Sequence, residues 1–412
     1  MSYYILPKNS NILNVTPTCQ SDTQREGETP FQSESPNQIY LSHSLFNYYN
    51  EIINHINSLC VLDASLNCYD EIVKIVNPYE YIFSPVPGSQ FSVSKLKSQS
   101  NIFYEFFEIA TTLNIFECYN ADSIKSLHIT PNSGDTIDCF EMLREHFSDD
   151  IECYNHLDDE TFKVIGYNKY DFMFFEPRSH DLNAYLYSLI EYVMIILRNQ
   201  VYGGSCVLKI SYIFHKPVVD IIYFLTALFD KVYIIKPNTS NITTFDRYIV
   251  CKNFRIGYGS DNINYLKLNY YRLLVFLKKL SNKSIVSLFT FDPPYYFTVK
   301  LEDMNMITGQ QQLESLNLII NIMRNKNKEE KIEMVKKAHI QKAVIWCEKN
   351  RVPCNRFSEK INIFMPIVKD SNNSIAKNNT YKRISHGFES QEFASIIEDY
   401  SSQDFSGHGL IN

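Results

Sequence analysis

A single lysine, Lys209, stands inside the hydrophobic stretch "GGSCVLKI" at residues 203–210. Such a stretch is typical of a strand in a parallel sheet, where a charge needs a partner or a chemical role. Two carboxylates occupy comparable places, since Glu176 ends the apolar stretch "YDFMFFEP" and Asp246 precedes "RYIVCKNF". Ligands of open parallel sheets bind beyond the carboxyl ends of the strands. We therefore expect Lys209, Glu176 and Asp246 to meet in one site.

Each of these residues also has an ordinary structural explanation. Lys209 could lie near the end of its strand and extend its ammonium group to solvent. Glu176, which precedes a proline, could simply end a strand, and Asp246 could accept hydrogen bonds from loop amides. The order and spacing of the three residues, rather than any one of them, favour a shared site.

The segments that carry these residues alternate between strand-like and helical patterns. Continuous apolar or alternating segments predict strands, and apolar residues at helical spacing predict helices. The strands are expected at 124–130, 161–166, 170–177, 204–213, 231–237 and 246–254, and the helices at 98–116, 136–147, 182–199 and 217–229. This alternation predicts an α/β fold with a Rossmann-like, doubly wound, mostly parallel sheet.

Two helical regions and two polar ends flank this alternating part. Residues 1–40 are rich in Ser, Thr, Asn, Gln and Pro and are expected to be flexible, and a disordered tail is expected at 366–412. Apolar residues at helical spacing predict a helical lead over 41–95 and a helical C-terminal extension over 261–365. The sheet is therefore expected within 96–260.

The composition limits the partners and the compartment. Of 412 residues 45% are hydrophobic, which allows a large core, and the formal net charge of −7 gives no overall basic field. A nucleic acid would therefore have to bind at a local patch. The ten cysteines form no CxxC pair, which predicts no metal site and a reducing, cytoplasmic setting. The longest apolar run has about 12 residues, against the roughly 20 that span a bilayer, so no membrane partner is expected.

The stretch "GGSCVLKI" and the stretch "FDKVYIIKPNTSNITTFDRYIV" at 229–250 together carry a resemblance to a known family. The sequence resembles the FtsJ-like RNA 2′-O-methyltransferases, in which two glycines, a hydrophobic run and a lysine are followed by Lys-Pro, a Ser/Thr-rich loop, an acid and Tyr-hydrophobic-Val. The resemblance covers residues 95–255 and extends to the cap methyltransferase-like proteins of large nucleocytoplasmic DNA viruses, of the asfarvirus and mimivirus type. It implies a methyltransferase fold over 96–260, S-adenosylmethionine as the cofactor, and RNA, including the 5′ cap of mRNA, as the partner.

The resemblance also implies a Lys-Asp-Lys-Glu tetrad. In the family one partly deprotonated lysine takes the proton from a ribose 2′-hydroxyl, and that oxygen then attacks the methyl group of the cofactor. Lys209 matches the central lysine, whereas Glu176 stands where the family has Asp and Asp246 where it has Glu. Glu105, in "YEFFEIA", stands at the place of the first lysine and reverses its charge, unless Glu105 is an ordinary solvent-facing helix residue.

The expected cofactor loop departs from the family pattern as well. The family has a glycine-rich turn after its first strand, which lets backbone amides approach the cofactor without a Cβ in the way. Here the stretch is "ITPNSGDTI", where Ser133, Gly134 and Asp135 take the cofactor-binding positions and Gly134 is the only glycine. The Asp135 carboxylate is expected close to the carboxylate of the cofactor, although "PNSGD" would also serve as an ordinary turn.

Two functional hypotheses follow. In the first, the chain is a pseudo-enzyme that keeps the fold to bind RNA or its cap, or supports a protein partner in mRNA capping or translation. In the second, it is an active S-adenosylmethionine-dependent cap 2′-O-methyltransferase. The charge reversal at Glu105 and the glycine-poor loop favour the first hypothesis, which we prefer, and the retained Lys209 favours the second.

Three further features allow alternatives. Asp292-Pro-Pro-Tyr295 matches the tetrapeptide with which amino-methyltransferases hold the N6 amine of adenine, although four such residues also arise by chance. The aromatic side chains of Tyr202, Tyr212 and Phe214 could stack on a base or fill the core. The lysine-rich stretch at 325–342 has acids at helical spacing, which is typical of a solvated helix face.

Overall fold

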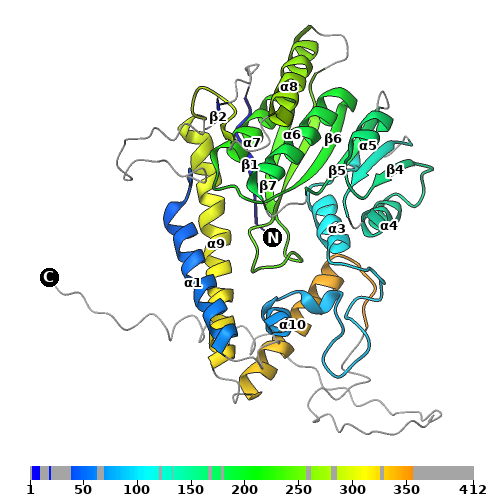
Figure 1. Cartoon of the computed structure of the whole chain (residues 1–412). Helices are drawn as coiled ribbons and strands as arrows, with labels where there is room; N and C mark the ends of the chain where they lie inside the picture. The colour runs from blue at the N-terminus through cyan, green and yellow to red at the C-terminus, as the bar shows by residue number, and fades with distance from the viewer. Residues whose placement is uncertain are drawn as a thin grey trace, which may run out of the picture. The chain divides into compact units, whose positions relative to one another are not determined.

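The computed structural model (Figure 1) describes eleven stretches of the chain, and all of them belong to one compact unit, Met1–Phe364. They are residues 2–9, 18–19, 39–62, 69–119, 123–131, 133–165, 169–177, 181–256, 261–279, 285–324 and 329–355. The tail predicted at 366–412 lies outside the described residues, as does most of the stretch predicted to be flexible.

A seven-stranded sheet forms the centre of this unit. Its strands lie in the order β1 (Ser2–Leu6), β7 (Phe229–Lys236), β8 (Arg247–Phe254), β6 (Gln200–Ile210), β5 (Tyr170–Phe175), β3 (Lys125–Ile129) and β4 (Asp150–Tyr154). The pairs β3–β4, β3–β5 and β5–β6 are parallel, and β8 runs antiparallel to both β6 and β7. Since β1 is antiparallel to β7, five of the seven strands share one direction. The predicted α/β, mostly parallel sheet is confirmed.

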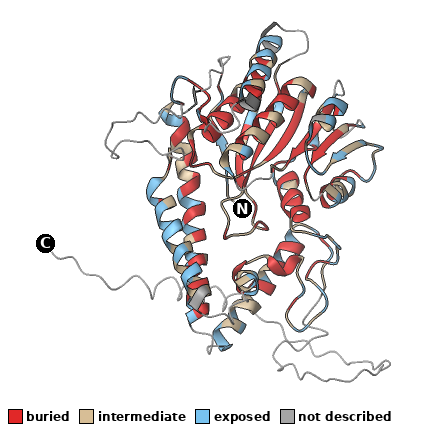
Figure 2. Cartoon of the chain, viewed as in Figure 1, coloured by how far each residue is buried: buried red, intermediate tan, exposed pale blue. Residues whose placement is uncertain are grey.

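Helices cover both faces of the sheet, as the strand alternation requires. Met173 and Phe175 of β5 belong to the apolar cluster formed with α6 (Leu182–Asn199), α7 (Lys216–Leu228) and α8 (Asp261–Lys279). Phe172 and Phe174 point to the other face, in a cluster with α3 (Ile102–Thr112), α4 (Ser133–Leu143) and α10 (Glu329–Lys349). Figure 2 shows the resulting band of buried residues in the strands and the adjoining helix faces. The sheet is therefore doubly covered.

The helices expected on either side of the sheet pack against each other. Helix α1 (His43–Leu62) lies beside the long helix α9 (Tyr295–Arg324), and α2 (Tyr69–Val76) joins them (Figure 1). A third apolar cluster holds the three helices together, and its buried members are Ile56, Ile72, Val76, Leu316, Ile319, Ile320 and Met323. No helix in the stretches listed above has both the length and the apolar character needed to cross a membrane.

Several local predictions differ from the structure. The strand expected at 161–166 is instead a short helix, α5 (Asp159–Ile165), because β-branched residues there occur in an amphipathic turn rather than a sheet. Strand β4 was not predicted, since its edge position leaves it partly exposed and without an apolar run. Residues 2–6, within the stretch predicted to be flexible, form the edge strand β1. A small separate sheet pairs β2 (Thr18–Cys19) with β9 (Ile285–Ser287).

Candidate functional site

The sheet register brings polar side chains together at the carboxyl edge of the sheet. Ile129 of β3 pairs with Phe175 of β5, and Phe175 pairs with Leu208 of β6. The residues that follow these three are Thr130, Glu176 and Lys209. Because side chains alternate along a strand, all three project from one face of the sheet. Tyr248 of β8 pairs with Lys209 and extends the same row.

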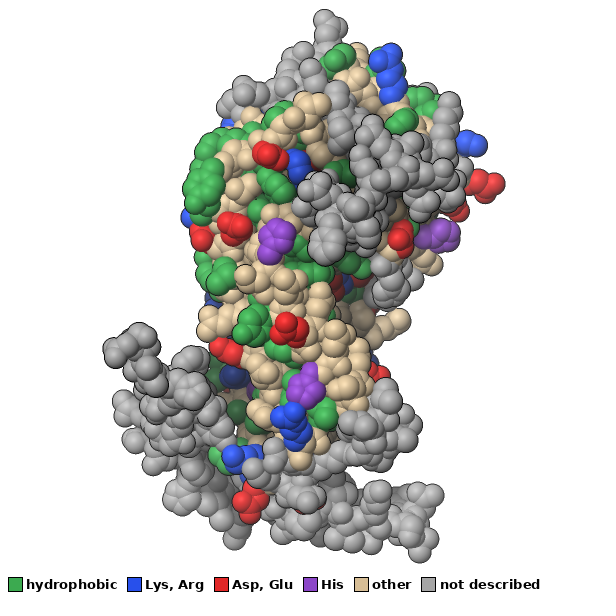
Figure 3. All heavy atoms as spheres, turned by 60° about the vertical axis from the view of Figure 1, so that its left-hand side comes forward, with side chains coloured by type: hydrophobic (Ala, Val, Ile, Leu, Met, Phe, Trp, Pro, Cys, Tyr) green, Lys and Arg blue, Asp and Glu red, His purple; other side chains and the backbone are tan. Residues whose placement is uncertain are grey.

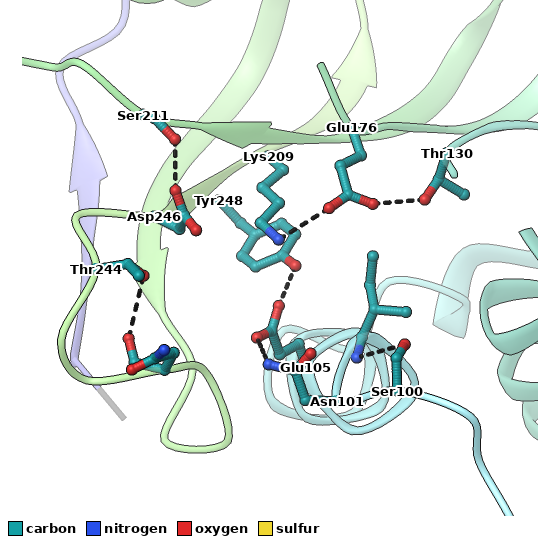
Figure 4. Close-up of polar contacts among 12 residues, drawn as sticks. Ser100, Asn101, Glu105, Thr130, Glu176, Lys209, Ser211, Thr244, Asp246 and Tyr248 are labelled. Atoms are coloured by element: carbon teal, nitrogen blue, oxygen red, sulfur yellow. Dashed lines mark hydrogen bonds and ion pairs between the residues drawn. The ribbon is translucent and has the colours of Figure 1, made fainter. Parts of the chain in front are cut away.

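Lys209 and Glu176 form an ion pair at this edge (Figure 4). The Lys209 Nζ atom lies 2.9 Å from Glu176 Oε1, and the Thr130 hydroxyl donates to Glu176 Oε2 at 2.5 Å. The two side chains keep 20% and 11% of their surface exposed, so a ligand can reach the pair from solvent. The structure thus brings together the lysine and the first of its expected acids.

The second acid, Asp246, lies at the start of β8 on the other side of Lys209. Its Oδ1 atom accepts a hydrogen bond from the Ser211 hydroxyl at 2.5 Å, and its charge contributes to the raised pKa of Lys209. Lys236, at the end of β7, holds the loop before Asp246. The Lys236 ammonium group donates to three backbone carbonyls, those of Asn241 at 2.9 Å, Thr244 at 2.6 Å and Asp246 at 3.1 Å.

Glu105 approaches the same group of charges from helix α3. Every residue from Ile102 to Ala110 is buried, because α3 packs between the sheet and α10. Glu105 is only 2% exposed. Its carboxylate accepts hydrogen bonds from the Tyr248 hydroxyl and from Asn101 Nδ2, the latter at 2.7 Å (Figure 4). The alternative that Glu105 is an ordinary solvent-facing residue is therefore wrong.

These contacts make the surroundings of Lys209 acidic. Burial alone would lower the pKa of Lys209, but the carboxylates of Glu105, Glu176 and Asp246 outweigh burial and raise that pKa above its ordinary value. For Glu105, burial raises the pKa, and Lys209 and the Tyr248 hydroxyl oppose this shift. These carboxylates therefore favour the protonated form of Lys209.

Three members of the site were missed in the sequence. Thr130 and Tyr248 follow from the alternation of side chains once the strand order is known, but a single sequence does not reveal that order. Lys236 carried a local signal, since it precedes a proline at the end of a predicted strand. Burial lowers the pKa of Lys236 to about 7 against the opposing effect of Asp246. Because Lys236 is buried, its hydrogen bonds go to the three loop carbonyls and not to water.

The residues expected to bind the cofactor lie in the first turn of α4, directly after β3. The Ser133 hydroxyl donates to Asn155 Oδ1 at 3.1 Å, and a Cβ added at Gly134 would meet no atom within 4 Å. Asp135 is 3% exposed, and its carboxylate accepts hydrogen bonds from the Gln99 amide at 2.8 Å and the Ser100 hydroxyl at 2.5 Å. Asp135 thus ties the chain before α3 to α4.

This arrangement fits the carboxylate end of S-adenosylmethionine at Ser133 and Gly134. Open space surrounds Gly134, and the amides at a helix N-terminus favour an anion. The Asp135 carboxylate is buried with its own donors and so does not hinder that approach. The single glycine is thus compatible with a close approach, and cofactor binding at Ser133, Gly134 and Asp135 stays a prediction.

The Asp292-Pro-Pro-Tyr295 segment does not lie where an amino-methyltransferase would need it. It follows β9, which belongs to the small two-stranded sheet rather than to the carboxyl edge beside β3. Asp292 lies 3.1 Å from the Lys216 ammonium group at the start of α7, and Tyr295 is 81% exposed. The structure gives the adenine hypothesis no support.

The three aromatic residues named from the sequence have different surroundings. Tyr202 lies in the amino-terminal half of β6, remote from the carboxyl edge. Phe214 is 2% exposed and packs against Phe46 at 5.2 Å and Phe245 at 4.6 Å between ring centroids, which makes it a core residue. Tyr212 is partly exposed. Burial raises the pKa of Tyr212, and the charge of Asp246 contributes to the same rise.

Comparison with known proteins finds sequence similarity over part of the chain. No family model matches the chain. A stretch of 122 residues is 27% identical to a cap-specific mRNA (nucleoside-2′-O-)-methyltransferase 1 from Leishmania braziliensis. The match covers 29% of this chain and 29% of that protein, so the chain spans less than a third of its relative.

Solved structures show only a slight overall likeness. A protein described as a ribosomal RNA methyltransferase from Plasmodium falciparum has a TM-score of 0.30 and 12% identity, over 38% of this chain and 98% of its own. Human methyltransferase-like protein 13, solved with SAH, has a TM-score of 0.24 and 12% identity, over 42% and 90% of the two chains. The expected resemblance to RNA 2′-O-methyltransferases is thus confirmed as weak sequence similarity, and the likeness to viral members stays a prediction.

Proposed function

We propose that this protein is a methyltransferase-like protein that binds the 5′ cap region of mRNA at the carboxyl edge of its sheet and transfers methyl groups slowly or not at all. The partly exposed Lys209–Glu176 pair and the sequence similarity to a cap-specific mRNA methyltransferase support RNA as the ligand. On this proposal the protein acts as an RNA-binding or regulatory subunit in mRNA capping or translation, alongside a protein partner.

The observation that carries the proposal is the position of Glu105. It places a third carboxylate beside Lys209 where the family has a lysine, and the pKa of Lys209 is raised rather than lowered. A lysine that takes a proton from a 2′-hydroxyl must be partly neutral at working pH. Each unit by which its pKa exceeds the pH reduces the neutral fraction about tenfold. Proton transfer to Lys209 is therefore disfavoured.

The same geometry suits Lys209 for binding. An ammonium group fixed by Glu176 can donate its remaining hydrogens to a ribose hydroxyl or a phosphate oxygen without a change of rotamer. The net charge of −7 gives no overall basic field that would favour RNA. On the face shown in Figure 3, the described basic side chains are scattered among acidic and hydrophobic ones. Binding therefore depends on local contacts at the site rather than on a general basic field.

The alternative is an active S-adenosylmethionine-dependent cap 2′-O-methyltransferase, and the open space at Gly134 favours it. Ser133 and Gly134 would hold the carboxylate end of the cofactor, which supplies an activated methyl group when bound. Lys209 would face the 2′-hydroxyl, Glu176 would fix the lysine, and Asp246 would orient the sugar. The two hypotheses agree on the RNA and differ in the protonation of Lys209.

Variants of Glu105 separate these hypotheses. Glu105→Lys restores the charge pattern of the family, and Glu105→Gln removes the charge with less change in shape. Methyl transfer to capped RNA would be measured in single turnover between pH 7 and pH 9, and RNA binding by fluorescence anisotropy. Glu80→Gln is the matched control, because Glu80 is a buried acid whose partners are Asn77 and Ser84 rather than Lys209.

We expect the unmodified protein to bind capped RNA, Lys209→Ala to weaken binding about tenfold, and methyl transfer to rise only in the Glu105 variants. Efficient transfer by the unmodified protein would favour the alternative. Absence of RNA binding by the unmodified protein would contradict both hypotheses.

A further inference from the structure

Tyr212 adopts a backbone conformation that is unfavourable for an aromatic residue. Its φ angle is 57°, in the left-handed region that glycine and asparagine adopt most readily. The other described non-glycine residues with positive φ are Ser42, Asn114, Asn253 and Arg351. Two of these are asparagines, and Arg351 follows the end of α10, where left-handed residues are common. Tyr212 has neither explanation.

The surrounding structure holds Tyr212 in this conformation. The Ser211 amide donates to the Tyr185 hydroxyl at 2.7 Å, and the His215 amide donates to the Tyr212 carbonyl at 3.1 Å. The Ser211 hydroxyl is bound to Asp246 at 2.5 Å. A strained residue fixed from both sides by hydrogen bonds is most often found at a functional site.

Tyr212 lies just beyond the end of β6, and its neighbour Ser211 contacts Asp246 of the candidate site. Tyr212 follows Lys209 by three residues, beyond the carboxyl end of β6. Burial raises the pKa of Tyr212, and the charge of Asp246 adds to this rise. The ring packs edge-on against Tyr185, with centroids 5.0 Å apart and planes at 64°. Unlike Phe214, which is buried in the core, Tyr212 keeps part of its surface exposed.

We propose that Tyr212 is the stacking platform for an unpaired nucleobase, that of the nucleotide whose 2′-hydroxyl lies at Lys209. Aromatic rings bind splayed bases by stacking on their faces, and such contacts tolerate any base. The inference rests on the proposed function, because it assumes that the site takes RNA.

The test compares two RNA probes. One is a capped, fluorescein-labelled pentanucleotide, and the other is the same RNA with an abasic first nucleotide. The unmodified protein should bind the intact probe about tenfold more tightly than the abasic one. Tyr212→Ala should bind both probes equally, at the level of the unmodified protein with the abasic probe. Tyr212→Phe keeps the ring and should behave like the unmodified protein.

A stability measurement shows whether the strain belongs to the binding site. Tyr212→Gly should melt at a higher temperature than Tyr212→Ala, because both variants lose the ring and only glycine relieves the strain, and it should abolish the preference for the intact probe. Arg351→Gly is the matched control, because it relieves the same strain at a φ of 57°, remote from the site, and should raise the melting temperature with no effect on RNA binding.

The results distinguish this inference from the proposed function. If Tyr212→Ala keeps the preference for the intact probe while Lys209→Ala loses affinity, the platform lies elsewhere and the proposed function stands. If Tyr212→Gly melts at or below the melting temperature of Tyr212→Ala, the backbone at Tyr212 is not strained and the inference is wrong. If the unmodified protein binds neither probe, both proposals are wrong.

Discussion

His128 lies in the middle of β3 with no exposed surface, and neither ring nitrogen has a hydrogen-bond partner among the described residues. Four phenylalanine rings surround it at centroid distances of 5.4–6.2 Å, those of Phe106, Phe140, Phe172 and Phe174. A charged imidazole in this environment would lose its hydration without compensation. Burial accordingly lowers the pKa of His128 from its ordinary 6.5 to about 3.

This shift makes the stability of the protein depend on pH. Below pH 6.5 the unfolded chain binds a proton at His128 that the folded chain does not, so the free energy of unfolding falls as pH falls. pH 5 lies about 1.5 units below the pKa of His128 in the unfolded chain. The free energy of unfolding at pH 5 is therefore about 2 kcal/mol lower than at pH 8. The loss continues until the pH reaches the folded pKa of about 3.

Replacing His128 with phenylalanine should remove this dependence. The ring then fits the aromatic surroundings without two unsatisfied nitrogens, so we expect His128→Phe to gain about 1–3 kcal/mol at pH 8. Between pH 8 and pH 5 the variant should lose about 2 kcal/mol less than the unmodified protein. Some pH dependence should remain, because burial also lowers the pKa of His339 to about 4.

The assay is urea unfolding followed by circular dichroism at pH 5, 6, 7 and 8. His146→Gln serves as the control, since the His146 side chain is 85% exposed and its replacement should leave the pH dependence unchanged. The explanation fails if His128→Phe loses as much stability between pH 8 and pH 5 as the unmodified protein does. A loss of stability at pH 8 in both His128→Phe and His128→Leu would also refute it.

Three further changes test the packing and the loop before Asp246. Gly204→Ala should reduce the free energy of unfolding by about 2 kcal/mol or more, because a Cβ there would lie 2.8 Å and 2.9 Å from two backbone carbonyl oxygens, those of Asp171 and Val201. Gly134→Ala, whose Cβ meets no atom within 4 Å, should be neutral or gain up to about 1 kcal/mol in the same urea titration. Lys236→Met should weaken capped-RNA binding, because Asp246 loses its anchor. It should also flatten the rise in stability from pH 7 to pH 9. Burial lowers the pKa of Lys236 to about 7, so in that range the unfolded chain binds the extra proton. An unchanged pH slope in Lys236→Met would count against this assignment.

The central strands could be predicted because their patterns are local. β5 is a nearly continuous apolar run and β8 contains the apolar run at 248–251, a pattern typical of strands covered on both faces. β1 and β4 lie at the edges of the sheet, where partial exposure removes that pattern. The segment of α5 resembles a strand in the sequence because seven residues are too few to distinguish a helical period from a short alternation of apolar and polar residues.

The ion pair of the site could be predicted for a different reason. Glu176 and Lys209 end adjacent parallel strands, so a correct strand order brings them together whatever the details of packing. The surroundings of Glu105 could not be predicted, because they depend on how α3 docks on the sheet. The hydrogen bond from Tyr248 joins residues 143 positions apart in the chain, and no local pattern encodes it.

Lys236 raises the question of whether a second lysine replaces the one that Glu105 displaced. It lies within electrostatic range of Lys209, Asp246 and Glu105, and burial lowers its pKa to about 7. If Lys236 acted as the missing lysine, its charge would lower the pKa of Lys209, yet that pKa is raised. The reason is geometric, since the Lys236 ammonium group donates to three loop carbonyls whereas the Glu176 carboxylate contacts Lys209 directly. Lys236 therefore positions Asp246, and Glu105 is the acid whose replacement by lysine would return Lys209 toward neutrality while leaving its contact with Glu176 in place.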